Sequence, residues 1–188
     1  TETVSWLAVA EGSHVLDNGA TLVAGTASAG TAYANVSFGE TLTNAVVLHE
    51  VTSVNDPDAV VSRVRNVDSA GFKVRNREQE QGTSHVAEEI SWVAVEAGSG
   101  PGIDVGLSGD EVSHVADSFV FTDNFAAAPV LLADMQTRDG GDTSNLRLAS
   151  ADATGFSAFV AEEQSRDAEL NHTNEVIGWF ALEDGFIF

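Results

Sequence analysis

Near the centre of the chain lies the sequence Glu88-Glu89-Ile90-Ser91-Trp92-Val93-Ala94-Val95-Glu96-Ala97-Gly98. A variant of it begins the chain, and another nearly ends it, around Trp6 and Trp179. The three tryptophans of the chain all lie in these copies, at intervals of 86 and 87 residues. Such a fixed long period is typical of tandem structural repeats. We therefore interpret the chain as two repeats of about 87 residues, 13–98 and 99–188, preceded by an extra copy of the Trp segment at 1–12.

The residues between the Trp segments have the patterns of β-strands. Asn44 to Val51 is a largely apolar run, which predicts a strand that is buried on both sides. Phe72 to Arg75 alternates apolar and basic residues, as a half-exposed strand does. The same order of segments returns in the second repeat, and no long run has helical spacing. The prediction is an all-β protein of two tandem antiparallel β-sandwich repeats plus an extra N-terminal strand.

The N-terminal copy of the Trp segment needs a partner. Residues 4–10 are mostly β-branched or small and predict a strand, yet an unpaired strand edge invites aggregation. This strand either belongs to a preceding repeat or is lent to a neighbouring one by strand addition. We therefore expect it to be paired, within the chain or with another copy, and we expect self-association through it.

Composition narrows the classes of partner. The chain has 29 acidic and 8 basic residues and a net charge of −21, which repels nucleic acids and anionic membranes. No apolar run reaches the length of a membrane span, and the absence of cysteine excludes disulfides and thiolate chemistry. The sequence predicts no nucleic-acid binding and no membrane insertion.

The order of strands and turns resembles the H-type lectin domain. The resemblance covers about 60 residues of each repeat and consists mostly of core and turn positions. The first repeat carries it in Val36-Ser37-Phe38, Ala45-Val46-Val47-Leu48, Arg63-Val64-Arg65-Asn66-Val67, Gly71-Phe72-Lys73-Val74 and Ile90-Ser91-Trp92-Val93-Ala94-Val95. The second carries it in Phe121, Pro129-Val130-Leu131, Leu146-Arg147-Leu148, Thr154-Gly155-Phe156 and Ile177-Gly178-Trp179-Phe180-Ala181-Leu182.

The resemblance implies a secreted, sugar-binding or adhesive module built as an antiparallel sandwich. Such domains bind N-acetylgalactosamine-type sugars, so glycans or a cell-surface polysaccharide are the expected partners and the expected location is extracellular or at the cell surface. Matching the family's acidic, arginine and histidine positions selects three residues in each repeat as sugar-binding candidates. They are Asp56, Arg63 and His85 in the first repeat, and Asp139, Arg147 and His172 in the second.

Two of these positions have other interpretations. His85 and Glu88 recur as His172 and Glu175, a pair that binds metal or sugar hydroxyls or that holds a loop by a structural hydrogen bond. Recurrence in both repeats favours the structural role. The acidic turns are candidate calcium ligands, because Ca²⁺ takes six to eight oxygens, several from carboxylates. The candidates are Asp56, Asp58, Asp139 and Asp142, although their spacing matches no known calcium loop.

Nothing in the sequence indicates an enzyme. The carboxylate pairs Glu78/Glu80 and Glu162/Glu163 have the composition of a glycosidase site, but a catalytic pair also needs a deep cleft. Nucleophile elbows and phosphate-binding loops are absent. We expect no catalysis and no obligatory cofactor. Asn35-Val36-Ser37 and Asn171-His172-Thr173 are glycosylation sequons.

A second function remains open from the sequence. The chain has features of a structural β-sandwich repeat from a filament, a surface layer or a giant adhesin, with subunits linked by strand exchange. The leading strand favours this interpretation, as does the lack of an aromatic residue in the loops before Trp92 and Trp179.

Overall fold

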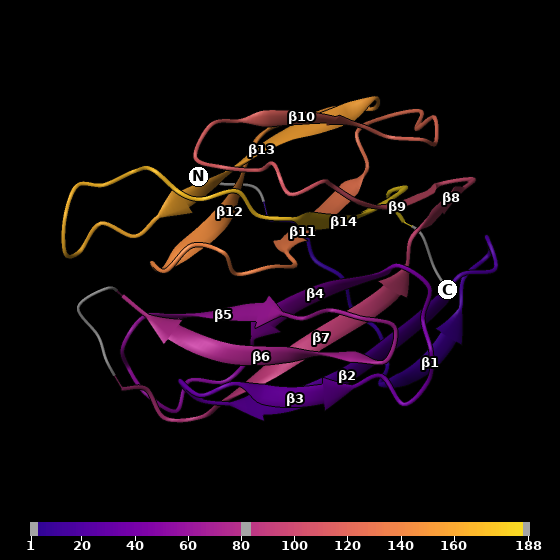
Figure 1. Cartoon of the computed structure of the whole chain (residues 1–188). Helices are drawn as coiled ribbons and strands as arrows, with labels where there is room; N and C mark the ends of the chain where they lie inside the picture. Colours follow the sequence, from indigo (N-terminus) through magenta and orange to yellow (C-terminus); the bar gives the residue numbers. More distant parts are fainter. Residues whose placement is uncertain (1–3, 80–83, 186–188) are drawn as a thin grey trace.

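The computed structural model describes residues 4–79 and 84–185 of the chain (Figure 1). This part of the chain contains 14 strands in four antiparallel sheets and no helix. The predicted all-β class with antiparallel pairing is therefore confirmed. No helix that is long and apolar enough to cross a membrane occurs among these residues.

The first repeat is a sandwich of two sheets. Its inner sheet has the order β1-β2-β7-β4, and its outer sheet has the order β3-β6-β5. All pairs of neighbouring strands are antiparallel. The strands are β1 (Gly12–Val15), β2 (Thr21–Ala29), β3 (Ala34–Ser37), β4 (Ala45–Val51), β5 (Val60–Arg65), β6 (Gly71–Glu78) and β7 (Glu88–Glu96).

The second repeat has the same topology. Its inner sheet has the order β8-β9-β14-β11, and its outer sheet has the order β10-β13-β12, so each strand has a counterpart in the first repeat. The Trp strands β7 and β14 lie at equivalent central places. The strands are β8 (Gly98–Gly100), β9 (Ile103–Leu107), β10 (Asp117–Val120), β11 (Val130–Met135), β12 (Ser144–Ala151), β13 (Gly155–Glu162) and β14 (Ile177–Leu182).

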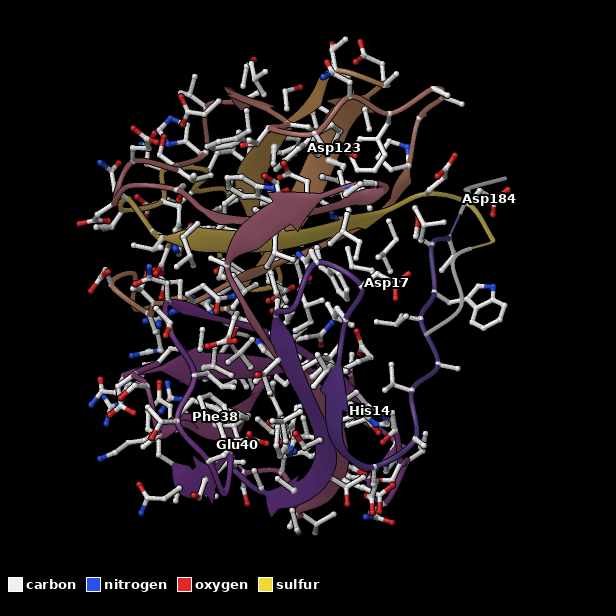
Figure 2. All side chains as sticks on the ribbon, turned by 90° about the vertical axis from the view of Figure 1, so that its right-hand side faces the viewer. His14, Asp17, Phe38, Glu40, Asp123 and Asp184 are labelled. Carbon is white, nitrogen blue, oxygen red and sulfur yellow. The ribbon has the colours of Figure 1, made fainter. Side chains whose placement is uncertain are left out.

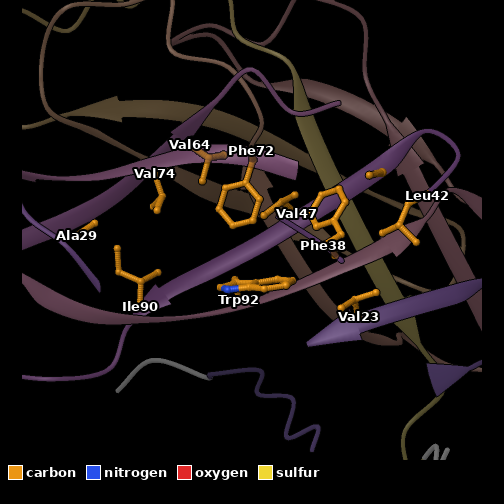
Figure 3. Packing of buried hydrophobic residues seen from close by; sticks show 12 residues of the cluster. Val23, Ala29, Phe38, Leu42, Val47, Val64, Phe72, Val74, Ile90 and Trp92 are labelled. Carbon is orange, nitrogen blue, oxygen red and sulfur yellow. The ribbon is translucent and has the colours of Figure 1, made fainter. Parts of the chain in front are cut away.

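Each sandwich is built around its tryptophan. Trp92 is 7% exposed, and the centroid of its indole lies 5.6 Å from that of Phe72 and 6.0 Å from that of Phe38 (Figure 3). Gly25 lies opposite Trp92 in the strand register, where a Cβ atom would come within 2.7 Å of the indole. Trp179 has an equivalent aromatic cluster, so the repeated tryptophans are core anchors.

A third core joins the two repeats. Each inner sheet packs one face against the outer sheet of its own repeat and the other face against the inner sheet of the other repeat. The four sheets therefore stack in the order outer, inner, inner, outer. Figure 1 shows the second repeat stacked on the first. All six residues of β14 are buried as a result. The main contributors to this third core are Leu22, Ala24, Val46, Val95, Ile103, Val105, Phe180 and Leu182.

The N-terminal Trp segment is not a strand, which corrects the prediction for residues 4–10. Residues 4–10 have no strand pairing, and Val4 and Trp6 are 78% and 76% exposed. Figure 2 shows this segment running along the outside of the molecule beside His14 of β1. The physical reason is the missing partners: its counterparts β7 and β14 each lie between two strands, and the described chain offers no third place of this kind.

Candidate functional site

Each repeat holds a buried histidine between two carboxylates. In the second repeat, His172 Nδ1 lies 2.8 Å from Glu162 Oε1, and His172 Nε2 lies 3.0 Å from Glu175 Oε1. The side chains of His172 and Glu175 are fully shielded from solvent. Burial by itself disfavours the imidazolium, but hydrogen bonds to Glu175 and Glu162 raise the pKa of His172. In the first repeat, His85 Nε2 lies 3.1 Å from Glu88 Oε1, but His85 Nδ1 lies 3.4 Å from Glu78 Oε1 without a hydrogen bond between them.

One of the two carboxylates beside each histidine, Glu88 or Glu175, holds the loop that follows the edge strand of the inner sheet. Glu88 accepts hydrogen bonds from the backbone N–H groups of Asn55 and Asp56 and from the hydroxyl of Ser53. The hydroxyl of Ser53 is the largest cause of a lowered pKa at Glu88. The Glu88 side chain is 1% exposed. The carboxylate therefore has its hydrogen bonds within the protein, which is the structural role that recurrence favoured.

Glu175 repeats this arrangement and adds an arginine. It accepts from the N–H groups of Asp139 and Gly140 and from the hydroxyl of Thr137. Burial by itself would raise the pKa of Glu175, but the hydrogen bonds and the charge of Arg63 lower it to about 2. Glu175 is therefore an ionised carboxylate at neutral pH.

The structure separates the two arginines that the sequence matched. Arg63 of β5 is 1% exposed and reaches the second repeat, where it pairs with Glu175 Oε1 at 3.0 Å. It also donates to Ser144 Oγ at 2.6 Å and to the carbonyl of Thr137. Arg147 of β12 is exposed and forms no ion pair with any residue that the structure describes. Arg63 thus links the two repeats, and only Arg147 faces solvent.

The acidic turns do not converge on a cation. Asp56 is half-buried and accepts the N–H of Asp58 in a local turn, while Asp139 and Asp142 are exposed. Within the described ranges, one group of three carboxylates brings oxygens within 4.8 Å of one another: Asp142, Glu162 and Glu169. Glu162 is already bonded to His172, so this group offers fewer free oxygens than Ca²⁺ usually takes. Calcium binding stays a prediction without structural support here.

Polar side chains of the second repeat also cap a strand edge of the first. The N–H of Val47 in β4 donates to Gln136 Oε1 at 2.8 Å. The Gln136 amide nitrogen in turn donates to the C=O of Val47, also at 2.8 Å. Asp134 accepts from the N–H of His49 at 3.3 Å. Burial lowers the pKa of the His49 imidazole to about 4 and raises that of Asp134 to about 7. No pattern in the sequence indicates these contacts, because they depend on how the two repeats pack.

A groove of about 550 Å³ opens between the repeats. Amide and carboxylate side chains line it, among them Asn44 and Asn66, which both have positive φ angles of 48° and 53°. None of the six predicted sugar-binding residues lines this groove. His85 and His172 are buried within their own repeats, so the six residues do not form one site.

The chain is similar to halomucin from Haloquadratum walsbyi (strain DSM 16790 / HBSQ001), with 29% identity over 188 residues. The match covers 95% of this chain and 2% of halomucin. The chain therefore spans about one fiftieth of the length of that relative. No model of a known protein family and no solved structure matches the chain.

Proposed function

We propose that this chain is a non-catalytic structural block of an extracellular surface protein, in which two β-sandwich repeats form one rigid unit. The proposal rests on the burial of Arg63, whose side chain is shielded from solvent and paired with Glu175 of the other repeat. A buried charge is tolerated only when it is paired and hydrogen-bonded. Separating the repeats would therefore leave Arg63 and Glu175 without their ion pair.

The rest of the interface supports rigidity. The third core continues across both inner sheets, and Gln136 occupies the edge of β4 where another strand would otherwise pair. Domains on flexible linkers have small, more polar contacts and move relative to each other. A continuous apolar core with capped edges instead suits a spacer or a wall element.

Two features support a place in a large extracellular assembly. Halomucin, which the chain resembles, is some fifty times longer than the matched segment. A net charge of −21 keeps a long chain soluble and apart from other anionic surfaces. A lectin role for the six predicted residues is less well supported, because Arg63, His85 and His172 are buried and already bonded.

Self-association through the N-terminal segment belongs to this proposal. Trp6 is exposed, whereas its counterparts Trp92 and Trp179 are both buried in sandwich cores. Exposed apolar side chains with a strand-forming sequence are suited to pairing with another copy. Leu7 and Val9 pack against the third core, so deletion of residues 1–11 should lower the stability of the fold without preventing folding. The deletion should abolish concentration-dependent assembly, as measured by sedimentation. Unchanged assembly of the truncated chain would rule this pairing out.

The experiment that tests the rigid block follows urea unfolding by tryptophan fluorescence. In a Trp6→Phe background, a Trp92→Phe variant reports the second repeat and a Trp179→Phe variant reports the first. The unfolding midpoint from fluorescence is compared with the midpoint from circular dichroism of the same variant. This comparison removes the effect that loss of a tryptophan has on stability. We expect fluorescence and circular dichroism to coincide in both variants, as one cooperative unit requires. A fluorescence midpoint that departs from the dichroism midpoint would show two independent repeats.

A further inference from the structure

The few basic residues of this acidic protein are concentrated on one face. Of the 8 basic residues, five lie on β5 and β6 of the outer sheet of the first repeat. In the strand register Arg63 lies opposite Arg75, and Arg65 lies opposite Lys73. We call the solvent-facing members of this set, together with a neighbour from the second repeat, the arginine face: Arg65, Lys73, Arg75, Arg77 and Arg138.

The strand alternation explains why these side chains share a face. Along β6, Phe72, Val74 and Asn76 are buried inside the sandwich, so Lys73, Arg75 and Arg77 point outward and are half-buried. Side chains two residues apart on a strand are spaced by about 6.8 Å. The face therefore presents a row of positive charges at regular intervals.

This row has no paired carboxylate within the described chain, although Arg77 and Arg138 both donate to the carbonyl of Gly141. Arg63 has its carboxylate in Glu175, but no carboxylate oxygen of a described residue lies within 4.0 Å of Arg65, Lys73, Arg75 or Arg77. Burial lowers the pKa of Arg75, and the neighbouring Arg138, Arg77 and Arg65 charges lower it further. Like charges placed directly across a strand pair are destabilising, so an anion would relieve this face.

An aromatic ring orders the guanidinium groups. Arg65 Cζ lies 3.8 Å and Arg75 Cζ lies 4.8 Å from the centroid of the Tyr33 ring. The Nε atoms of Arg65, Arg75 and Arg77 are shielded from solvent and have no hydrogen-bond partner among the residues the structure describes. Planar guanidinium groups held in place lose less entropy when they bind a carboxylate or a sulfate.

We propose that the arginine face binds anionic carbohydrate through carboxylate or sulfate groups, a function beyond that of the structural block. Carbohydrate is favoured over a peptide because the sequon residue Asn35 is exposed on the same face, directly opposite Lys73 in the register. Both residues line a shallow hollow of about 390 Å³, which Asp68 also lines. An acidic protein surface, including that of a second copy of the chain, is the alternative occupant that polyglutamate represents in the test below.

The test measures binding of the intact chain to four polymers at low ionic strength, where screening is weak. Polygalacturonate carries carboxylates, dextran sulfate carries sulfates, plain dextran is neutral, and polyglutamate is an acidic peptide. The Arg65→Gln/Arg75→Gln variant removes two charges from the face. The Arg147→Gln/Arg166→Gln variant removes two exposed charges elsewhere and is the matched control.

We expect one or both acidic polysaccharides to bind and plain dextran not to bind. The Arg65→Gln/Arg75→Gln variant should weaken binding by about tenfold or more, since charge-assisted hydrogen bonds are lost, and the control variant by less than about twofold. Equal weakening in both variants, or no binding of either acidic polysaccharide, would overturn the proposal. Equally tight binding of polyglutamate through the same arginines would replace carbohydrate with acidic peptide. Thermal unfolding of both variants checks that the fold is retained.

Two sources of such a carbohydrate are distinguished by Asn35. In protein from a host that glycosylates the sequon, an attached anionic glycan would occupy the face and block added polymer, so Asn35→Gln would restore binding. Equal binding with and without Asn35→Gln would identify a separate polysaccharide as the occupant.

Discussion

Arg63 and Arg147 show how position in the assembly decides what one residue type does. They hold matching places in the two repeats, but Thr137 and Ser144, at the two ends of the loop between β11 and β12, bond to Arg63 and not to Arg147. These contacts remove water from the guanidinium and make its ion pair with Glu175 obligatory. The sequence identified the pair of arginines correctly and could not distinguish them, because this loop comes from the other repeat.

Arg63→Met should therefore destabilise the protein strongly. The variant leaves the Glu175 carboxylate buried without its cation, which typically costs about 3–5 kcal/mol. Arg147→Met is the control and should change the free energy of unfolding by less than about 0.5 kcal/mol, because its side chain is exposed. Urea unfolding at neutral pH measures both, and equal stabilities of the two variants would contradict the role given to Arg63.

Gly106 matters because of the indole that packs on it. A Cβ atom there would lie 2.1 Å from Cζ2 of Trp179, whereas one at Gly98 would meet nothing within 4 Å. Gly106→Ala should thus lower the free energy of unfolding by about 1–3 kcal/mol through overpacking, and Gly98→Ala should be nearly neutral. Thermal denaturation compares them, and a neutral Gly106→Ala variant would mean that the indole moves at little cost.

At the scale of elements, the sequence predicted strands where the apolar pattern is local. The run at Asn44 to Val51 was expected to be buried on both sides, and β4 does contact the cores on both faces of its sheet. Residues 4–10 carry the same strand pattern without forming one, because pairing depends on a neighbour that the pattern does not encode. The cap of β4 by Gln136 was missed for a related reason: Thr52 holds the equivalent place in the first repeat, and only the packing of the repeats explains the difference.

Gln136→Leu tests the cap of β4. The change removes both hydrogen bonds to Val47 and leaves a buried N–H and C=O unpaired, which should cost about 2 kcal/mol. Hydrogen exchange at the Val47 amide should accelerate more than exchange in β13, which lies far from the change. Gln164→Leu alters an exposed glutamine and serves as the control. Unchanged protection at Val47 would show that the Gln136 side chain does not hold this edge.

The loop anchored by Glu175 makes stability depend on pH. The folded-state pKa of Glu175, about 2, lies below the usual 4.5. The stability that ionised Glu175 contributes is therefore fully present above pH 4.5 and is lost as the pH falls toward 2. The shift corresponds to about 3 kcal/mol. Between pH 5 and 2, the free energy of unfolding of Glu175→Gln should fall less steeply than that of the wild type. Parallel curves for the two proteins would contradict the lowered pKa.

At the scale of the whole molecule, the third core makes the pair of repeats the folding unit. The 87-residue period indicated two sandwiches, but it carried no information about how they pack, because apolar residues on a strand's second face look the same in a sequence whichever sheet covers them. The candidate site was predicted least well for the same reason. Of its six residues, Arg63, His85 and His172 are used by packing within and between the repeats.

Phe180→Ala probes this coupling. Phe180 is fully buried in the third core and contributes to neither sandwich core, and its truncation should cost about 3–5 kcal/mol. Because the repeats share that core, fluorescence from Trp92 and from Trp179 should shift to the same lower urea midpoint. A shift confined to Trp179 would place the lost stability in the second repeat alone.

The pairing of Arg63 with Glu175 also bears on how a gene encoding such repeats changes in length. Recombination that removed one repeat would uncover the third-core face of the other and leave Arg63 or Glu175 without its partner, and the product would fold poorly. Duplication of the pair as a whole preserves every contact. Lineages that lengthen or shorten this protein should therefore do so in steps of two repeats, and alleles that differ by one repeat should be rare.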